Sequence, residues 1–262
     1  MRYIFDHDLH IHSHISLCSN DPAQTNEAIL QYAVDNKLNT ICLTDHYWDE
    51  TVPGGFTDFY KQQDTAHIRQ ALPLPQAEGV RFLFGCETDL DKNCTLGISP
   101  EAMKDMAFII IPTTHLHMNG FTCRGDEGID ERRALWSSRF DAVLDMKLPF
   151  EKVGIAHLTC ELHCRGHMPE LLAGIPDEEY SRLFRKAADR GIGVELNFNS
   201  LALTDETKDA ILNPYRIAKA EGCKFYFGSD AHHPAGLARE KANAENIIDL
   251  LELTEADKWV LA

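Results

Sequence analysis

The sequence has little positive charge. Its 262 residues contain 25 Lys and Arg against 41 Asp and Glu, which gives a formal net charge of −16. A chain without a basic surface lacks the electrostatic footprint that binds a long nucleic acid, so we expect no such partner. A small anionic substrate remains compatible with this charge, because bound metal ions can reverse the field inside a cleft.

Long apolar runs and a disulfide framework are also lacking. The longest apolar stretch, at 107–112, is far shorter than the roughly 20 residues that span a bilayer. The first residues show no apolar run followed by a small-residue cleavage site. Eight cysteines in 262 residues are too sparse for a disulfide scaffold. We expect a cytoplasmic protein with no membrane partner, and no pattern indicates an oligomeric state.

Short apolar runs alternate with segments of helical period along the chain. The expected strands are 8–12, 40–43, 80–84, 107–111, 153–156, 193–196 and 224–227. The expected helices include 25–36, 177–190, 205–221 and 240–251. Asp177 and Asp205 are expected to cap the starts of two of them. This alternation predicts an α/β fold with a parallel sheet, either open or closed into a barrel.

Two stretches interrupt the alternation. Residues 47–79 contain several prolines and glycines and are expected to hold one short helix, and residues 117–150 contain a glycine-rich segment followed by a helix around 131–146. Both follow the ends of expected strands, where barrel enzymes place the loops that cover their sites. Because no repeat or linker is visible, we expect one domain over 1–262 with these two excursions.

Histidines and carboxylates stand at the carboxyl ends of six of the seven expected strands. His10 and His12 end the first strand and face the same way, because alternate residues of an extended chain do so. The other ends carry Asp45-His46, Glu87, His115, His157 and Asp230-Ala231-His232. Since the carboxyl ends of parallel strands converge on one crevice, these side chains are expected to form one site.

This set of donors indicates metal ions. Imidazole nitrogens mixed with carboxylate oxygens suit Zn, Mn or Fe, whereas oxygen ligands alone would suit Mg or Ca. The set is too large for one tetrahedral ion, so we expect about two to three divalent ions, with a carboxylate bridging two of them. The expected ligands are His10, His12, His46, Glu87, His115, His157, Asp230 and His232.

These residues resemble the PHP family, which is named for polymerase and histidinol phosphatase. The matching segments are Asp8-Leu9-His10-Ile11-His12, Thr44-Asp45-His46, Gly85-Cys86-Glu87 and Ser229-Asp230-Ala231-His232, with His115 and His157 as single matches. The motifs occur in order over nearly the whole chain. The resemblance implies a distorted (β/α)7 TIM-like barrel that holds up to three metal ions at its carboxyl face.

The resemblance also implies how the ligands are shared. The three sets are His10, His12, Glu87 and Asp230 for one ion, Glu87, His115 and His157 for a second, and His46 and His232 for a third. Asp45 would orient a liganding histidine from behind.

The third ion is where this sequence departs from the family. Members often carry a further His or Asp some way after the His-x-His motif, and that place here is occupied by Cys18. Three alternatives follow from this difference. Cys18 supplies a thiolate, or Asp21 reaches in from the same loop, or the third ion is weakly bound or absent.

The function implied by these residues is hydrolysis of a phosphomonoester of a small metabolite, as in histidinol phosphatases. A metal-bridging water or hydroxide would attack phosphorus, and Arg165 and Arg239 are candidates to hold the phosphate. Candidate proton donors to the leaving group are His117, His163, His167 and His233. Two alternatives remain, namely amidohydrolase-type hydrolysis and a non-catalytic metal-binding module of the same family.

Overall fold

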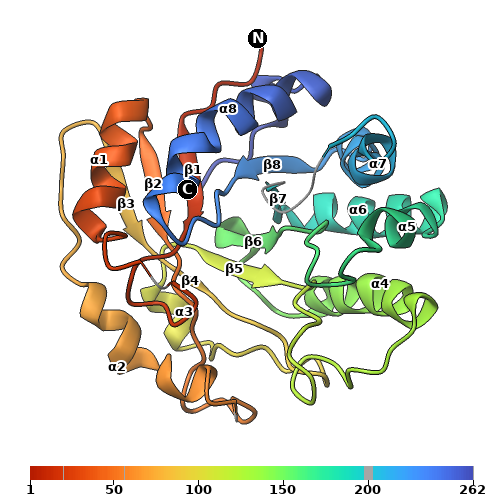
Figure 1. Ribbon diagram of the computed structural model, residues 1–262, viewed down its shortest axis with the longest axis horizontal. Helices are drawn as coiled ribbons and strands as arrows, with labels where there is room; N and C mark the ends of the chain where they lie inside the picture. The colour runs from red at the N-terminus through yellow and green to blue at the C-terminus, as the bar shows by residue number, and fades with distance from the viewer. Residues whose placement is uncertain (20, 56, 198–202, 262) are drawn as a thin grey trace.

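The computed structural model describes residues 1–19, 21–55, 57–197 and 203–261. Its strands are β1 (His7–Ile11), β2 (Thr40–Leu43), β3 (Arg81–Phe84), β4 (Cys86–Glu87), β5 (Ile109–Pro112), β6 (Val153–Ala156), β7 (Gly193–Leu196) and β8 (Lys224–Phe227). One sheet has the order β1-β2-β3 and the other β4-β5-β6-β7-β8, and the pairing is parallel throughout (Figure 1). The predicted α/β fold with parallel strands is confirmed.

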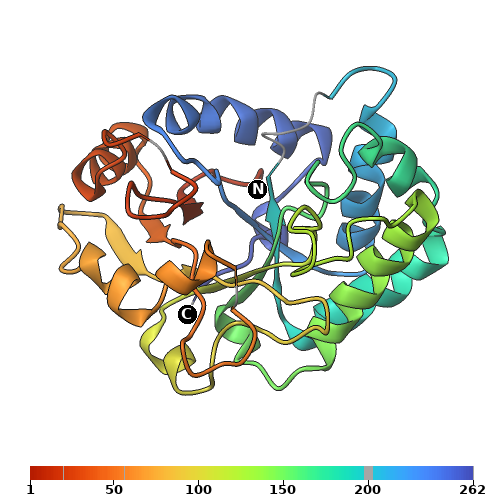
Figure 2. The same ribbon diagram turned by 60° about the horizontal axis from the view of Figure 1, so that its bottom comes forward.

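Helices connect the strands and lie outside them, as Figure 2 shows. They are α1 (Asn26–Asn36), α2 (Thr65–Ile68), α3 (Ala102–Asp105), α4 (Ile129–Asp145), α5 (Met168–Ala173), α6 (Asp177–Arg190), α7 (Lys208–Ala220) and α8 (Pro234–Leu250). Short 3-10 turns occupy Tyr60–Gln62, Arg69–Ala71, Phe150–Lys152 and Glu255–Asp257. In α6 the helical period buries one apolar face, made of Tyr180, Leu183, Phe184 and Ala187. No helix within the described ranges is long and apolar enough to cross a membrane.

The third expected strand, 80–84, corresponds to β3, which pairs with β2, and the chain continues after Gly85 as a separate short strand, β4, which pairs with β5. A side chain at Gly85 would meet the carbonyl oxygen of Phe108 at 2.3 Å, so the close approach of the two backbones requires glycine. Isolated parallel bridges, His46 with Glu87 and Ile11 with Ala231, connect the two sheets beside the carboxyl ends of their strands.

Three expected helix starts differ from the structure. Asp177 is the first residue of α6 rather than its cap. Its negative charge lies in the first turn, where it interacts favourably with the positive end of the helix dipole. Asp205 precedes α7, which starts after Thr207. Helix α8 starts at Pro234 rather than at residue 240, because proline fits the first turn of a helix.

The two excursions meet beside the carboxyl ends of the strands. The first holds α2 with its flanking 3-10 turns, and the second contains α4. Trp48 and Tyr60 of the first excursion form an apolar cluster with Phe121 of the second. This packing places both segments over the end of the sheet at which the predicted site residues lie.

Candidate metal centre

Four side chains from β1, β4 and the segment after β8 form the first cluster, which consists of His10, His12, Glu87 and Asp230. The Nε2 atoms of the two histidines lie 3.1 Å apart. Nε2 of His12 lies 3.2 Å from Oε2 of Glu87 and 3.1 Å from Oδ1 of Asp230, and Nε2 of His10 lies 3.4 Å from each of these atoms. Two ligand atoms that are each about 2.1 Å from a tetrahedral ion lie about 3.4 Å apart, so this spacing fits one ion.

Glu87 also belongs to the second cluster, which it forms with His115 and His157. Its Oε1 lies 3.3 Å from Nε2 of His157 and 3.9 Å from Nε2 of His115. The two oxygens of one buried carboxylate therefore face different groups of imidazoles. This is the disposition of a carboxylate that bridges two ions.

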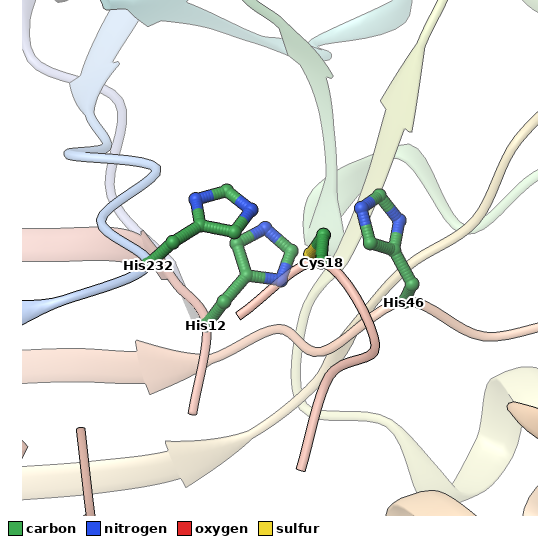
Figure 3. A group of neighbouring side chains, drawn as sticks. All are labelled: His12, Cys18, His46 and His232. Atoms are coloured by element: carbon green, nitrogen blue, oxygen red, sulfur yellow. The ribbon is translucent and has the colours of Figure 1, made fainter. Parts of the chain in front are cut away.

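The third cluster contains His12, Cys18, His46 and His232, and one ligand atom of each lies within 4.8 Å of the others (Figure 3). The rings of His12 and His232 stack with centroids 4.3 Å apart, and the ring of His46 lies 4.8 Å from that of His12. Each of the three sets implied by the family resemblance lies within one of these clusters, and the third cluster also contains His12 and Cys18. Metal binding by them stays a prediction.

Hydrogen bonds behind four of the imidazoles fix which nitrogen faces the clusters. Nδ1 is bonded in each case to an oxygen, in the pairs His10 with Glu195 (2.7 Å), His115 with Asp89 (3.1 Å), His157 with Thr114 (3.1 Å) and His232 with the carbonyl of Asp230 (2.7 Å). An oxygen acceptor requires a proton on Nδ1, which leaves the lone pair on Nε2. Metal-binding histidines are oriented in this way, so the residues present fit divalent metal ions.

Glu195 is a site residue that the sequence reasoning missed. It lies on β7, the strand to which no site residue was assigned, and its side chain is fully buried. Its Oε1 contacts His10, and its Oε2 accepts the backbone N–H of His157 at 2.6 Å. A side chain at Gly228 would meet Oε1 of Glu195 at 2.1 Å, so this glycine makes room for the carboxylate. The signal in the sequence that could have identified it is a charged residue within an otherwise apolar strand.

Asp89 is the second missed residue. Its Oδ2 accepts from Nδ1 of His115 and, in a short hydrogen bond, from the hydroxyl of Tyr60. It stands two residues after Glu87, a spacing that puts both side chains on one side of an extended chain. The first excursion therefore reaches the second cluster through Tyr60.

The electrostatics of the first and third clusters differ. Burial alone would lower the pKa of His12, but the carboxylates of Asp230 and Glu87 raise it to about 9. Burial lowers the pKa of His46 to about 3 and that of His232 to about 4. The first cluster therefore favours positive charge among its carboxylates, which a proton or a divalent ion supplies. His46 and His232 of the third cluster stay neutral instead.

Two other predicted residues act on the backbone. Asp45 lies 3.9 Å from Nδ1 of His12, and its carboxylate accepts from the backbone N–H and the hydroxyl of Ser13, each at 2.7 Å. It therefore holds the loop after His12 more closely than it holds the ring. Asp21 is in none of the three clusters, and its Oδ1 accepts the N–H of Ala23 at 2.9 Å.

A cavity of about 290 Å³ opens on the clusters. Its lining comprises Cys18, His46, Glu87, Asp89, His115, His117, Asp230 and His232, together with Phe59, Tyr60, Met118 and Leu162. His117 and Leu162 also border a second cavity, which Arg165 lines. Arg165 therefore lines a cavity that shares two residues with the cavity on the clusters. Arg239 is exposed on α8 and lines neither cavity.

Of the four candidate proton donors, His117 alone lines the cavity that opens on the clusters. His163 is buried against the carbonyl of Arg132, at 2.8 Å from Nε2. His167 is exposed and contacts Glu170, and His233 is the exposed residue that precedes α8.

Comparisons with known proteins agree with this geometry. The PHP domain family model matches residues 8–197. A probable phosphatase from Caldicellulosiruptor bescii is 24% identical over 237 residues, which are 88% of this chain and 83% of that protein. A histidinol phosphate phosphatase from Lactococcus lactis, solved with zinc, L-histidinol and phosphate, superposes with a TM-score of 0.62 at 17% identity, covering 96% of this chain and 95% of that chain. The family match spans most of the chain and includes the first two clusters apart from Asp230, and we conclude that this chain belongs to the PHP domain family.

Proposed function

We propose that this chain is a metal-dependent phosphoesterase that hydrolyses a phosphomonoester of a small metabolite. The observation that carries the proposal is the position of Glu87, whose two oxygens face separate groups of imidazoles at the base of a cavity. Two ions bridged in this way suit displacement at phosphorus, where both the attacking and the leaving oxygen need stabilisation. The phosphatases among the relatives support the same reaction.

The ions would be of the zinc, manganese or iron type. The residues that would hold them are His10, His12, Glu87 and Asp230 for one ion and Glu87, His115 and His157 for another. When bound, such ions stabilise negative charge on phosphoryl oxygens and lower the pKa of a water molecule. Glu195 and Asp89 orient His10 and His115 and so keep their Nε2 lone pairs directed at the clusters.

The cavity suggests how the remaining parts of a substrate are held. Arg165 is exposed and forms no ion pair or hydrogen bond with another described residue, so its guanidinium would be free to bind a phosphate oxygen. His117 would donate a proton to the leaving oxygen. Phe59, Met118 and Leu162 would contact the organic group, for which a cavity of about 290 Å³ permits only a small molecule. Histidinol phosphate, the substrate of the Lactococcus lactis relative, is one candidate.

We also propose that the strands close into a distorted (β/α)7 barrel and that residues 1–262 form a single domain. Support comes from the parallel bridge between Ile11 and Ala231, which brings the first and last strands side by side, and from the bridge between His46 and Glu87 (Figure 1). With β3 and β4 counted as one interrupted strand, the described strands number seven.

The test is turnover of p-nitrophenyl phosphate, followed by a panel of phosphorylated metabolites. Activity should vanish on chelation, return with Mn²⁺ or Zn²⁺, and be lost in Glu87→Gln. The matched control is Glu151→Gln, which changes an exposed carboxylate away from the cavity. Metal binding without turnover of any phosphoester would contradict the proposal and favour a non-catalytic module, whereas turnover of a cyclic amide would favour an amidohydrolase.

A further inference from the structure

The third cluster contains a sulfur ligand, which the other two lack. Cys18 has a free thiol, is half-buried, and lines the same cavity as His46 and His232. Figure 3 shows its side chain between the rings of His12 and His46, and one ligand atom each of Cys18, His46 and His232 lies within 4.8 Å of the others. The thiol is thus close enough to share one ion with two imidazoles.

The loop that carries Cys18 is tied down on both sides. Gln63, which is fully buried, accepts the backbone N–H of Leu17 at 3.0 Å with its Oε1. The hydroxyl of Ser19 donates to the carbonyl oxygen of His232 at 2.7 Å. These two bonds fix the position of Cys18 relative to His232 and to the first excursion. A ligand that is held in place before the ion arrives loses little conformational entropy on binding.

The two imidazoles beside the thiol have unused nitrogens. Nδ1–H of His232 donates to the carbonyl of Asp230, so the lone pair of His232 is on Nε2. His46 is only 6% exposed, and its Nδ1 lies 3.2 Å from Oε2 of Glu87 without the geometry of a hydrogen bond, so this nitrogen has no hydrogen-bond partner among the described residues. A buried imidazole without such a bond is costly unless a ligand occupies its lone pair. This second observation, independent of the cysteine, also indicates an ion.

Burial and nearby carboxylates raise the pKa of the Cys18 thiol, so the sulfur would be a thiolate only when it binds an ion. The hydroxyl of Ser16 lies 3.2 Å from Sγ of Cys18 and can donate to it. The same hydroxyl can instead donate to Oε1 of Gln63, at 3.3 Å. If it turns toward the sulfur, Oε1 of Gln63 still accepts the N–H of Leu17.

We propose that Cys18, His46 and His232 form a thiolate-containing site that selects a thiophilic divalent ion such as zinc over manganese. Thiolate is a soft ligand that favours zinc, whereas imidazole with carboxylate accepts manganese as well. His12 is shared with the first cluster, so the site has three ligands of its own and an open position toward the cavity, as in catalytic zinc sites. The chain would therefore bind ions of different preference at neighbouring positions.

The inference rests on the metal dependence in the proposed function and needs no assumption about the substrate. Its first test is titration of the metal-free, full-length protein with Co²⁺ alone. Cobalt bound to a thiolate gives a sulfur-to-cobalt charge-transfer absorption in the near ultraviolet, which nitrogen and oxygen ligands do not give. We expect this band in the wild type and in Cys94→Ser, which removes a half-buried thiol outside the clusters. Cys18→Ser should lose the band.

The second test is elemental analysis after dialysis against a large excess of Mn²⁺ over Zn²⁺, because sites of imidazole and carboxylate also bind zinc more tightly when the two ions are equally concentrated. The wild type should retain about one zinc per chain that manganese does not replace, and Cys18→Ser should lose about that one ion. Cys18→His should recover the ion without the charge-transfer band and should accept manganese in its place. A band that persists in Cys18→Ser, or that is absent from the wild type, would overturn the proposal.

These readouts separate the two proposals. Cobalt binding with the thiolate band but without turnover of any phosphoester would remove the proposed function and leave the thiolate site. Turnover of a phosphoester by a protein that shows no thiolate band would remove the thiolate site alone.

Discussion

Glu195 joins His10 to the backbone of a neighbouring strand end. One carboxylate oxygen lies 2.7 Å from Nδ1 of His10, and the other accepts the N–H of His157 at 2.6 Å. One buried acid thereby connects a residue of the first cluster to a residue of the second. Each of its oxygens faces a donor, so the site needs two acceptors at this position.

Glu195→Gln should weaken metal binding without unfolding the protein. The amide can accept only through its oxygen, so its NH2 group would face either His10 or the N–H of His157. Loss of such an orienting contact typically costs about 10–100-fold in metal affinity. Competition with a chromophoric chelator measures the change, with Glu151→Gln as the control. Unchanged affinity would show that Glu195 does not position His10.

Asp89→Asn should affect the second cluster in the same way, and Tyr60→Phe should have a smaller effect. Asp89 accepts from both His115 and Tyr60 with the same oxygen, Oδ2, so the amide can keep both contacts only through a neutral oxygen and removes the negative charge behind His115. We expect about 10–100-fold weaker binding of an ion at the second cluster for Asp89→Asn. Tyr60→Phe keeps the carboxylate and should lose less than that. Equal affinities in both variants and the wild type would contradict this chain of contacts.

Arg165→Ala should raise KM for a phosphomonoester more than it lowers kcat. A charge-assisted hydrogen bond contributes about 1.5–3 kcal/mol, which corresponds to roughly 10–100-fold in binding. Arg239→Ala is the matched control, because Arg239 is exposed on α8 and lines neither cavity. If the two variants have the same KM, Arg165 does not hold the phosphate.

The metal-free protein should lose stability as the pH rises from 6.5 to 9. Contacts with Asp230 and Glu87 raise the pKa of His12 from 6.5 to about 9 despite its burial. The folded protein therefore binds this proton more tightly than the unfolded chain. The stabilisation is fully present below pH 6.5 and is lost as the pH rises through 9.

The stabilisation that is lost is on the order of 3 kcal/mol. Urea denaturation of chelated protein at several pH values measures it. Protein saturated with Zn²⁺ should lack this pH dependence, because the ion replaces the proton among the same carboxylates. A metal-free protein whose stability is constant over this range would contradict the raised pKa.

The strand ends could be predicted because two independent patterns coincide there. Short apolar runs mark the strands, and His or acidic residues stand at their carboxyl ends, as at His12 and His157. The parallel arrangement then brings these ends together whatever the details of the loops. The grouping of the donors in space followed from these two facts.

Glu195 and Asp89 could not be found by the same reasoning. Glu195 lies inside an apolar strand rather than after it, and its partner His10 is far away in sequence. The choice between Cys18 and Asp21 also depended on loop geometry. The loop bonds of Ser19 place Cys18 beside His232, whereas Asp21 turns back to the N–H of Ala23. Such contacts depend on three-dimensional packing, which local pattern does not encode.

The most direct test of the account is to count bound ions and measure turnover in the same samples. Metal-free protein is supplied with increasing Zn²⁺ or Mn²⁺, and phosphomonoester hydrolysis is followed in the wild type and in Glu87→Gln. The account predicts that wild-type turnover appears only as occupancy approaches about two ions per chain, and that Glu87→Gln binds fewer ions and is inactive. Full turnover in metal-free protein, in protein with a single ion per chain, or in Glu87→Gln would contradict it.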